Sequence, residues 1–260
     1  MRAAIVLDKS GTILKACRVV TDIHENQTFF HVNTLKFVVD IKGFLVNVKS
    51  TSSAIKKGSG LKFGKVICAS SNNLPKISEE ILREEKVSEA LKKVTIEAKR
   101  HCGSEIGTCA ALILNREGLP THAVGLGGRI YGDVRKVVEA FKRSDDDVFI
   151  ATGNCREATL RCAKILGIDR RFVLADASPK EKRDFVKMLR GFYGLVVMVG
   201  NDINDLLAMR EADISILVRR EEPNGVEVVP FEVDYIISSL RELPKIVYEI
   251  KKAEVKIDKK

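Results

Sequence analysis

The chain of 260 residues carries a formal net charge of +9, and 45% of its residues are hydrophobic. This length fits one large domain or two modest ones with a sizeable core. The apolar runs fall far short of the roughly 20 residues that a membrane-spanning helix needs, and the apolar N-terminal run is too short for a signal peptide. We therefore expect a cytoplasmic protein with no membrane partner.

The basic residues do not point to nucleic-acid binding. Lys and Arg are spread along the chain, without a basic block or the interleaved aromatic residues of a nucleic-acid surface. A positive balance of this kind favours anionic ligands in general.

The cysteines and histidines do not form a metal-binding pattern. Six cysteines lack any Cys-x-x-Cys spacing, and the four histidines do not cluster. In a cytosolic protein, such scattered cysteines are typical of small buried side chains, so we expect neither a zinc site nor a disulfide.

The first predicted element is a buried strand over 2–7, an apolar run that ends at Asp8. The segment 21–117 lacks a regular rhythm and contains one long helical stretch over 78–102, which we predict as a single helix. We interpret 21–117 as an inserted α+β cap domain. Its predicted strands are 44–48, 66–69 and 110–114.

Strands and helices alternate in the second half of the chain, which predicts βαβ units and a mostly parallel sheet. The fold class is therefore α/β, with a doubly wound, Rossmann-like core formed by residues 1–20 and 118–260. The predicted helices are 133–143, 155–166, 179–190 and 204–211. The predicted strands are 148–151, 172–175, 195–199 and 214–218.

Four polar motifs each follow a predicted strand, and the first is Asp8-Lys9-Ser10-Gly11-Thr12. Ligands of open α/β sheets bind beyond the carboxyl ends of the strands, so these motifs can converge on one site. A carboxylate in this position can attack a phosphoryl group, and the turn can present backbone amides to anionic oxygens. By itself, the motif also fits an ordinary Asx turn, in which the aspartate side chain bonds to the backbone.

The second and third motifs each lie where a predicted helix begins. Thr152-Gly153-Asn154 offers a hydroxyl and helix-start amides to a phosphate oxygen. Pro179-Lys180-Glu181-Lys182 offers a lysine that would neutralise charge on a carboxylate and on a transferring phosphate. A plain helix cap and a solvated helix face are the respective alternatives.

The fourth motif is Gly200-Asn201-Asp202-Ile203-Asn204-Asp205. Its oxygen-bearing side chains suit Mg²⁺, which binds carboxylates, carbonyls and water. A helix cap built of Asn and Asp is the alternative. The occurrence of all four motifs in this order, each at a predicted strand end, argues against coincidence.

The order and spacing of the motifs resemble the haloacid dehalogenase-like superfamily of phosphohydrolases. Residues 8–14 are similar to the Asp-Lys-Thr-Gly-Thr-Leu-Thr signature of P-type ATPases, and residues 198–205 match their Met-Val-Gly-Asp-Gly-Ile-Asn-Asp. Their Pro-x-x-Lys pattern makes Lys182, rather than Lys180, the motif lysine. The chain thus resembles a soluble P-type-ATPase-like phosphatase, and the cap lies outside the resemblance.

The resemblance implies an aspartyl-phosphate mechanism with Asp8 as the nucleophile and Mg²⁺ as the cofactor. The implied catalytic residues are Asp8, Ser10, Thr152 and Lys182. The implied phosphate-binding residues are Gly11, Thr12, Gly153 and Asn154. The implied metal ligands are Asp8, the Ser10 carbonyl, Asn201, Asp202 and Asp205.

Two positions depart from the family's pattern. Ser10 stands where most family phosphatases have a second Asp that acts as general acid and base, so hydrolysis of the phosphoenzyme is expected to be slow. Asn201 stands where the family usually has a magnesium-binding Asp, which leaves open whether Asn201 or Asp202 contacts the metal.

The sequence therefore predicts a Mg²⁺-dependent phosphohydrolase that acts on a phosphorylated small molecule. One alternative is an ATP-hydrolysing or phosphotransfer protein, although there is no Walker loop and the glycines of 125–128 are predicted to form a turn. The other is a non-catalytic phosphate-binding protein with a decayed site. The sequence names neither the substrate nor the oligomeric state.

Overall fold

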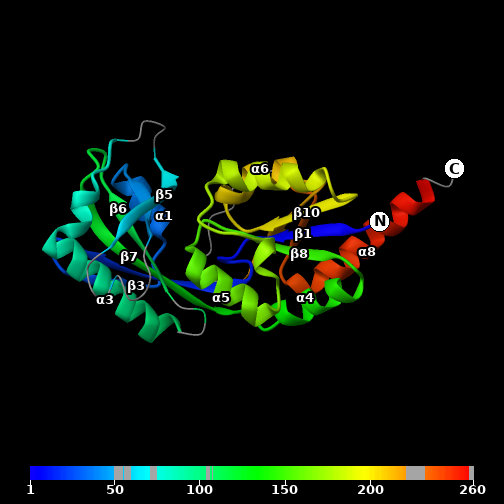
Figure 1. Cartoon of the computed structure of the whole chain (residues 1–260), viewed down its shortest axis with the longest axis horizontal. Coiled ribbons are helices and arrows are strands. Elements are labelled where there is room, and N and C mark those ends of the chain that lie inside the picture. The colour runs from blue at the N-terminus through cyan, green and yellow to red at the C-terminus, as the bar shows by residue number, and fades with distance from the viewer. Residues whose placement is uncertain are drawn as a thin grey trace.

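The computed structural model describes residues 1–49, 55, 60–70, 75–103, 106, 108–220 and 232–257. Two six-stranded sheets organise these residues (Figure 1). The first, here called the core sheet, has the order β12-β11-β10-β1-β8-β9 and is parallel throughout. The second, here called the cap sheet, has the order β3-β2-β7-β6-β4-β5 and is antiparallel.

The core sheet confirms the predicted α/β class. Its strands are β1 (Ala3–Leu7), β8 (Asp147–Ala151), β9 (Val173–Leu174), β10 (Leu195–Gly200), β11 (Ile214–Val218) and β12 (Tyr235–Ile237). Its helices are α4 (Val134–Arg143), α5 (Arg156–Leu166), α6 (Pro179–Arg190), α7 (Leu206–Glu211) and α8 (Leu243–Ile257). The predicted helix over 204–211 thus begins later, after a 3₁₀ turn at Ile203–Asp205.

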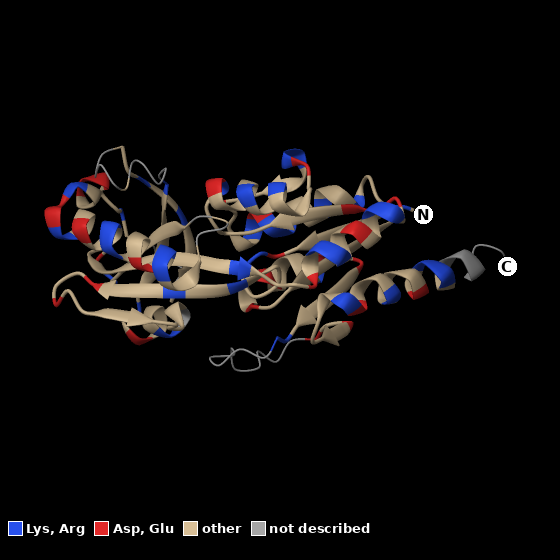
Figure 2. Ribbon diagram, turned by 90° about the horizontal axis from the view of Figure 1, so that it is seen from below, with Lys and Arg blue, Asp and Glu red and all other residues tan. Residues whose placement is uncertain are grey.

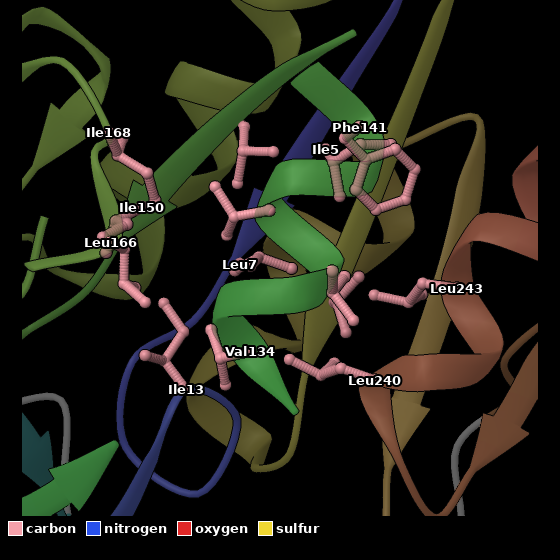
Figure 3. Close-up of a cluster of buried hydrophobic side chains, with 14 of the residues drawn as sticks. Ile5, Leu7, Ile13, Val134, Phe141, Ile150, Leu166, Ile168, Leu240 and Leu243 are labelled. Carbon is pink, nitrogen blue, oxygen red and sulfur yellow. The ribbon is translucent and has the colours of Figure 1, made fainter. Parts of the chain in front are cut away.

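Helices cover both faces of the core sheet because successive strand residues point to opposite sides. On β1, Ala3, Ile5 and Leu7 pack with α4, α5 and α8, whereas Ala4 and Val6 pack with α6 and α7. Figure 3 shows Ile5 and Leu7 against α4 and the segment that leads into α8. Burying each such aliphatic side chain contributes about 1.5–3 kcal/mol, so this double layer holds the strand ends firmly.

The cap sheet grows out of the core on two long strands. β2 and β7 pair antiparallel from Leu14↔Ile130 to Asp22↔His122. The division into a core of 1–20 and 118–260 and a cap of 21–117 stays a prediction. The strands of the cap sheet are β2 (Leu14–Asp22), β3 (Thr28–Phe30), β4 (Phe44–Lys49), β5 (Lys62–Ala69), β6 (Cys109–Leu114) and β7 (Pro120–Ile130), and its helices are α1 (Thr34–Asp40) and α3 (Glu85–Cys102).

The predicted turn at 125–128 is wrong, because these residues lie inside β7. Helix α3 crosses β7 so closely that a Cβ on Gly125 would meet the Val94 carbonyl oxygen at 2.2 Å. A Cβ on Gly127 would approach the Cys102 Cβ to 2.9 Å. The glycines therefore serve close helix-to-strand packing and not a change of chain direction.

The single helix predicted over 78–102 is divided in the structure. A 3₁₀ helix spans Glu79–Arg83, and α3 follows it. Ser78 caps the first piece, as its position predicts, by accepting a hydrogen bond from the Glu80 amide. Glu84 has an extended backbone with φ −59° and ψ 133°, and this conformation breaks the helix although no Gly or Pro marks it.

The expectation that the cysteines form no disulfide is also wrong. Cys17 bonds to Cys102 and Cys109 bonds to Cys155, with Cα–Cα distances of 5.3 and 5.7 Å. The partners are 85 and 46 residues apart, so only the tertiary fold brings them together. Cys68 and Cys162 are not part of a disulfide.

Charge is distributed over both parts of the molecule. In Figure 2, Lys and Arg are interspersed with Asp and Glu along the helices and strands. None of the described helices combines the length and the hydropathy needed to cross a bilayer.

Candidate active site

A cavity of about 640 Å³ lies at the carboxyl edge of the core sheet and is closed on one side by residues of the cap sheet. Strand β1 pairs in parallel with both β8 and β10, so the motifs that follow these three strands emerge side by side. Asp8, Thr152 and Asn201 line this cavity. The parallel topology thus brings together three motifs that are far apart in sequence.

Lys182 joins two of the predicted carboxylates. Its Nζ donates to Asp8 Oδ1 and to Asp205 Oδ1, each at 2.6 Å. The exposed fractions are 3% for Lys182, 6% for Asp8 and 1% for Asp205, which places all three almost entirely out of bulk water. Charge-assisted hydrogen bonds of this kind are stronger than those between neutral groups.

The start of α6 aims Lys182 inward. Ser178 and Glu181 form a capping box, and Pro179 occupies the first turn. This cap fixes the turn from which Lys182 projects, and the alternative of a solvated helix face does not describe Lys182, which is 3% exposed. Lys180, two residues earlier, is exposed on the same helix.

The electrostatics of this group favour a further cation. Burial raises the pKa of Asp8, and the Asp205 carboxylate raises it further, while Lys182 lowers it. Burial opposes the charge of Lys182, but the carboxylates of Asp205 and Asp8 hold its pKa above the usual value. Two carboxylates and one ammonium leave a negative balance, which would repel a phosphate dianion unless a metal cation compensates it.

The Thr152-Gly153-Asn154 segment forms a hydrogen-bonded loop over the cavity. Asn154 Oδ1 accepts from Thr152 Oγ1 at 2.8 Å and from Ser10 Oγ at 2.9 Å. From the cap sheet, Asn47 Nδ2 donates to the Gly153 carbonyl at 2.5 Å. The predicted phosphate loop is thus held from both sheets.

The residues of the first motif lie at different depths. Gly11 lines the cavity with φ +79°, and a Cβ there would meet the side-chain nitrogen Nδ2 of Asn201 at 1.9 Å. Its own amide donates to the Leu14 carbonyl. Thr12 is fully buried below the turn and is outside the cavity lining, while its carbonyl accepts from Arg220.

The fourth motif presents carboxylate oxygens at two positions, Asp202 and Asp205. Asp205 Oδ2 accepts from the Asn201 backbone amide at 3.1 Å, and Asp205 shares the Lys182 ammonium with Asp8. Asp202 Oδ1 accepts from the Ile203 amide at 2.6 Å as a helix cap, and burial raises the pKa of Asp202. The alternative of a helix cap therefore describes Asp202 well.

The donor set fits Mg²⁺. Among the described residues, no group of three His, Cys, Asp or Glu side chains converges as a self-sufficient metal site. Asp8, Asp205 and Asn201 nevertheless border one cavity and offer oxygen atoms. Mg²⁺ is typically held by one or two protein carboxylates and completes its shell with water and substrate phosphate oxygens.

Several cavity residues escaped the sequence prediction. Arg219 and Arg220 directly follow β11, so the rule that polar residues gather after strand ends could have found them. Asn47 lies outside the lining but donates to the Gly153 carbonyl, and it could have been noticed as one polar residue inside the apolar run of β4. The residues that line the cavity from the side of the cap sheet carry no such signal; they include Lys15, Arg18, His31 and Asn33.

Arg220 is fixed at the edge of the cavity. It contacts both carboxylate oxygens of Asp133 at 3.1 and 3.2 Å and lies over the Tyr131 ring. Burial acts against the ionised Asp133, but Arg220, Ser239 and the Leu240 amide lower the pKa of this carboxyl. The ion pair is formally neutral, and it fixes the Arg220 guanidinium beside the first motif, where Arg220 donates to the Thr12 carbonyl.

The chain is similar to known hydrolases and phosphatases. The model of the haloacid dehalogenase-like hydrolases matches residues 3–213. A soluble P-type ATPase-like phosphatase of Methanocaldococcus jannaschii is 27% identical over 265 residues, covering 98% of this chain and 97% of that protein.

Metal-transporting pumps are also similar. The chloroplastic copper-transporting ATPase PAA1 of Arabidopsis thaliana is 24% identical over 87% of this chain, which spans only 26% of that pump. The catalytic CPx-ATPase domain CopB-B aligns over 97% of this chain and 90% of that chain, at 17% identity and a TM-score of 0.48.

Proposed function

The chain belongs to the haloacid dehalogenase-like hydrolases, and from this premise we propose that it is a Mg²⁺-dependent phosphatase of phosphorylated small molecules. The proposed reaction passes through an aspartyl-phosphate on Asp8. The observation that carries the proposal is the buried contact of Lys182 with Asp8 and Asp205 at the floor of the cavity.

In the proposed mechanism, a carboxylate oxygen of Asp8 attacks the phosphorus atom in line with the leaving oxygen. The new Asp8–phosphorus bond forms as the ester bond breaks. Lys182 and the Thr152 hydroxyl bind the transferring phosphoryl oxygens, and Lys182 holds Asp8 in position during attack. Bound Mg²⁺ would neutralise charge on the phosphate and on the carboxylates. Water then attacks the phosphoenzyme and releases phosphate.

The two other functions have less support. The glycines of 125–128 lie in β7, so they do not supply a nucleotide loop. A decayed site would have no reason to keep Asp8, Lys182 and Asp205 buried together, because taking charged groups out of water is costly. The direct test is hydrolysis of p-nitrophenyl phosphate with Mg²⁺ and with a chelator. No hydrolysis in Mg²⁺ across a panel of phosphate esters would refute the proposal.

Substitution of the fourth motif should change metal affinity in opposite directions. Asn201→Asp adds a carboxylate beside Asp205 and should tighten Mg²⁺ binding to the free enzyme, whereas Asp205→Asn should nearly abolish it. Asp202→Asn is the matched control, because its carboxylate caps Ile203. Isothermal titration calorimetry measures the three affinities. Loss of binding in Asp202→Asn with retention in Asp205→Asn would instead assign the ligand to Asp202.

The identity of residue 10 should decide which step limits the rate. The Ser10 hydroxyl is a poor base near neutral pH and already donates to Asn154, so phosphoenzyme should accumulate and give a burst. Ser10→Asp should speed steady-state turnover by about 10²–10⁴-fold, the usual contribution of a general base.

Rapid-quench kinetics test this, with Ser10→Asn as the control because it matches Asp in shape but cannot act as a base. A wild type without a burst, together with a slower Ser10→Asp, would contradict the expectation.

A further inference from the structure

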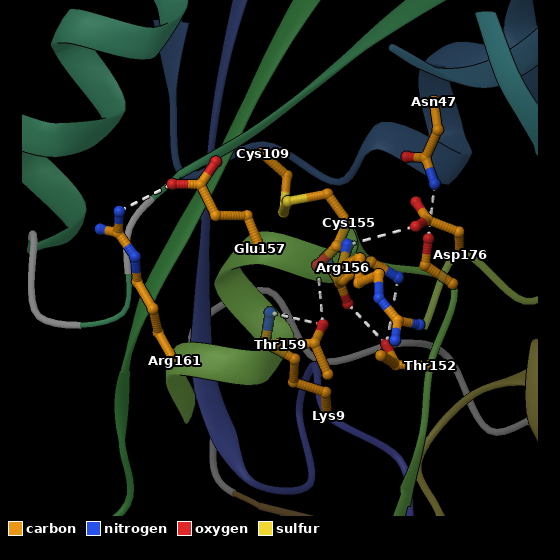
Figure 4. The surroundings of a disulfide bond; sticks show 12 residues. Lys9, Asn47, Cys109, Thr152, Cys155, Arg156, Glu157, Thr159, Arg161 and Asp176 are labelled. Atoms are coloured by element: carbon orange, nitrogen blue, oxygen red, sulfur yellow. Dashed lines mark hydrogen bonds and ion pairs between the residues drawn. A yellow bond between two sulfur atoms is a disulfide. The ribbon is translucent and has the colours of Figure 1, made fainter. Parts of the chain in front are cut away.

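The Cys109–Cys155 disulfide joins the two sheets at the edge of the candidate active site. Cys109 begins β6 of the cap sheet, and Cys155 caps the start of α5, directly after the Thr152-Gly153-Asn154 loop. Figure 4 shows the sulfur–sulfur bond between these elements, close to Thr152 and Thr159. A covalent bond therefore connects the cap sheet to the end of the phosphate loop.

Two polar contacts between the cap sheet and this region are individually weak, and they add to the apolar packing of Ala158 against cap-sheet residues. Asn47 donates to the Gly153 carbonyl from β4, and Lys65 of β5 forms an ion pair with Glu181 of α6. A hydrogen bond of this kind contributes about 0.5–1.5 kcal/mol net, and a partly exposed ion pair contributes about 0–1 kcal/mol. Such contacts can open and close, whereas the disulfide cannot without chemistry.

Cys155 is also connected to the residue next to the nucleophile. Its carbonyl accepts from Thr159 Oγ1 at 2.8 Å, and Thr159 Oγ1 accepts from Lys9 Nζ at 3.4 Å. Lys9 adjoins Asp8 and is 1% exposed. A restraint on Cys155 therefore acts on the segment that carries the phosphate loop and lies beside the end of β1.

The second disulfide provides an internal comparison. Cys17 of β2 and Cys102 of α3 both belong to the cap-sheet layer, and they are 8% and 4% exposed. Cys155, in contrast, is partly exposed. An external thiol thus reaches the bond between the sheets from the Cys155 side, while the bond within the cap-sheet layer is shielded.

We infer that Cys109–Cys155 is a thiol–disulfide exchange site that holds the cap sheet against the phosphate loop when oxidised and releases it when reduced. This inference rests on the proposed phosphatase function. In a cytosolic protein, a disulfide is usually transient and regulatory, so the reduced form would be the active one in the compartment expected from the sequence.

The exchange needs a dithiol as reductant. A thiolate of the dithiol attacks the Cys155 sulfur, the S–S bond breaks, and Cys109 leaves as a thiolate that takes up a proton. The second thiol of the reductant then displaces Cys155, so two electrons and two protons pass to the protein and the reductant becomes a disulfide. The product carries one thiol on Cys109 of the cap sheet and one on Cys155 at the start of α5.

Reduction should speed turnover because release of the cap sheet would open the cavity that cap-sheet residues line. Opening of a covering element limits the rate of many enzymes, and we expect the oxidised form to be slower by about tenfold in kcat. The Cys109–Cys155 disulfide lies beside the loop but is not one of the catalytic groups, so KM should change less than kcat.

The test compares the oxidised protein with the same protein after dithiothreitol, in wild type, Cys109→Ser and Cys17→Ser. We measure kcat and KM for p-nitrophenyl phosphate, and hydrogen–deuterium exchange of the peptide over 152–159. Wild type and Cys17→Ser should gain turnover and exchange faster on reduction. Cys109→Ser should behave as the reduced form under both conditions. Should Cys17→Ser fail to fold, Cys102→Ser replaces it.

Two results would overturn the inference: oxidised and reduced wild type that exchange alike, or Cys109→Ser that still responds to dithiol. If the reduced wild type hydrolyses no phosphate ester, the proposed function fails. The exchange rates of the 152–159 peptide then still decide whether the bond restrains the loop.

Discussion

Asp8→Asn should abolish Mg²⁺-dependent hydrolysis of an aryl phosphate. The amide oxygen can still accept from Lys182, so the buried contact keeps its shape, but an amide cannot form the phosphoenzyme. Removal of an essential nucleophile costs on the order of 10⁶-fold in kcat in a well-studied hydrolase, and we expect a loss of about 10⁴-fold or more here. The measurement is the steady-state rate with p-nitrophenyl phosphate.

A matched control separates this effect from a general disturbance. Asp176→Asn changes another half-buried carboxylate, which accepts from the Arg156 amide outside the cavity lining. This variant should retain turnover within a few-fold. Thermal melts of both variants check folding, and a folded Asp8→Asn with near wild-type activity would remove Asp8 from the mechanism.

Lys182→Met should impair both stability and catalysis. Without the ammonium, Asp8 and Asp205 face each other while almost fully buried, and removal of one partner from a buried ion pair typically costs about 3–5 kcal/mol. Catalysis should fall by about 10²–10³-fold as well, because a charge-stabilising donor to the transition state is lost. Both effects follow from one buried cation serving two carboxylates.

The stability loss should depend on pH in a defined direction. Burial and the Asp205 carboxylate already raise the folded-state pKa of Asp8 above its unfolded value, and loss of Lys182, which lowers this pKa, should raise it further. Groups with raised pKa favour the folded state below the unfolded pKa and lose that contribution as pH rises through the folded pKa. The deficit of Lys182→Met should therefore be larger at pH 8 than at pH 5, as measured by urea unfolding.

Lys180→Met is the control, because Lys180 is exposed on the same helix. It should change the free energy of unfolding by no more than about 0.5 kcal/mol, as is usual for surface sites. Equal effects of Lys180→Met and Lys182→Met would show that position on α6, and not the buried contact, determines the loss.

The sequence predicted the core of this protein well because its signals are local. Apolar runs of four or five residues define β1, β8 and β10, and each is followed by a polar motif. In a parallel sheet, the ends of such strands meet at one edge, so the sequence alone predicts that Asp8, Thr152 and Asn201 share one cavity.

The roles of the individual site residues remain predictions, and the structure sharpens some of them. It places Lys182 between two carboxylates, and it buries Thr12 outside the cavity lining. It also pairs the Ser10 hydroxyl with Asn154. These distinctions depend on rotamers and depth, which a motif does not encode.

By itself, then, the sequence determined the parallel core and the four motifs, since hydrophobic periodicity and strand-end residues are properties of short segments. Only the tertiary structure decided which cap-sheet residues line the cavity. It also decided that α3 packs closely against the glycines of β7 and that Cys109 bonds to Cys155. These features arise from contacts between residues tens of positions apart. Such contacts are set by the packing of whole elements, for which the local pattern of side chains carries no signal.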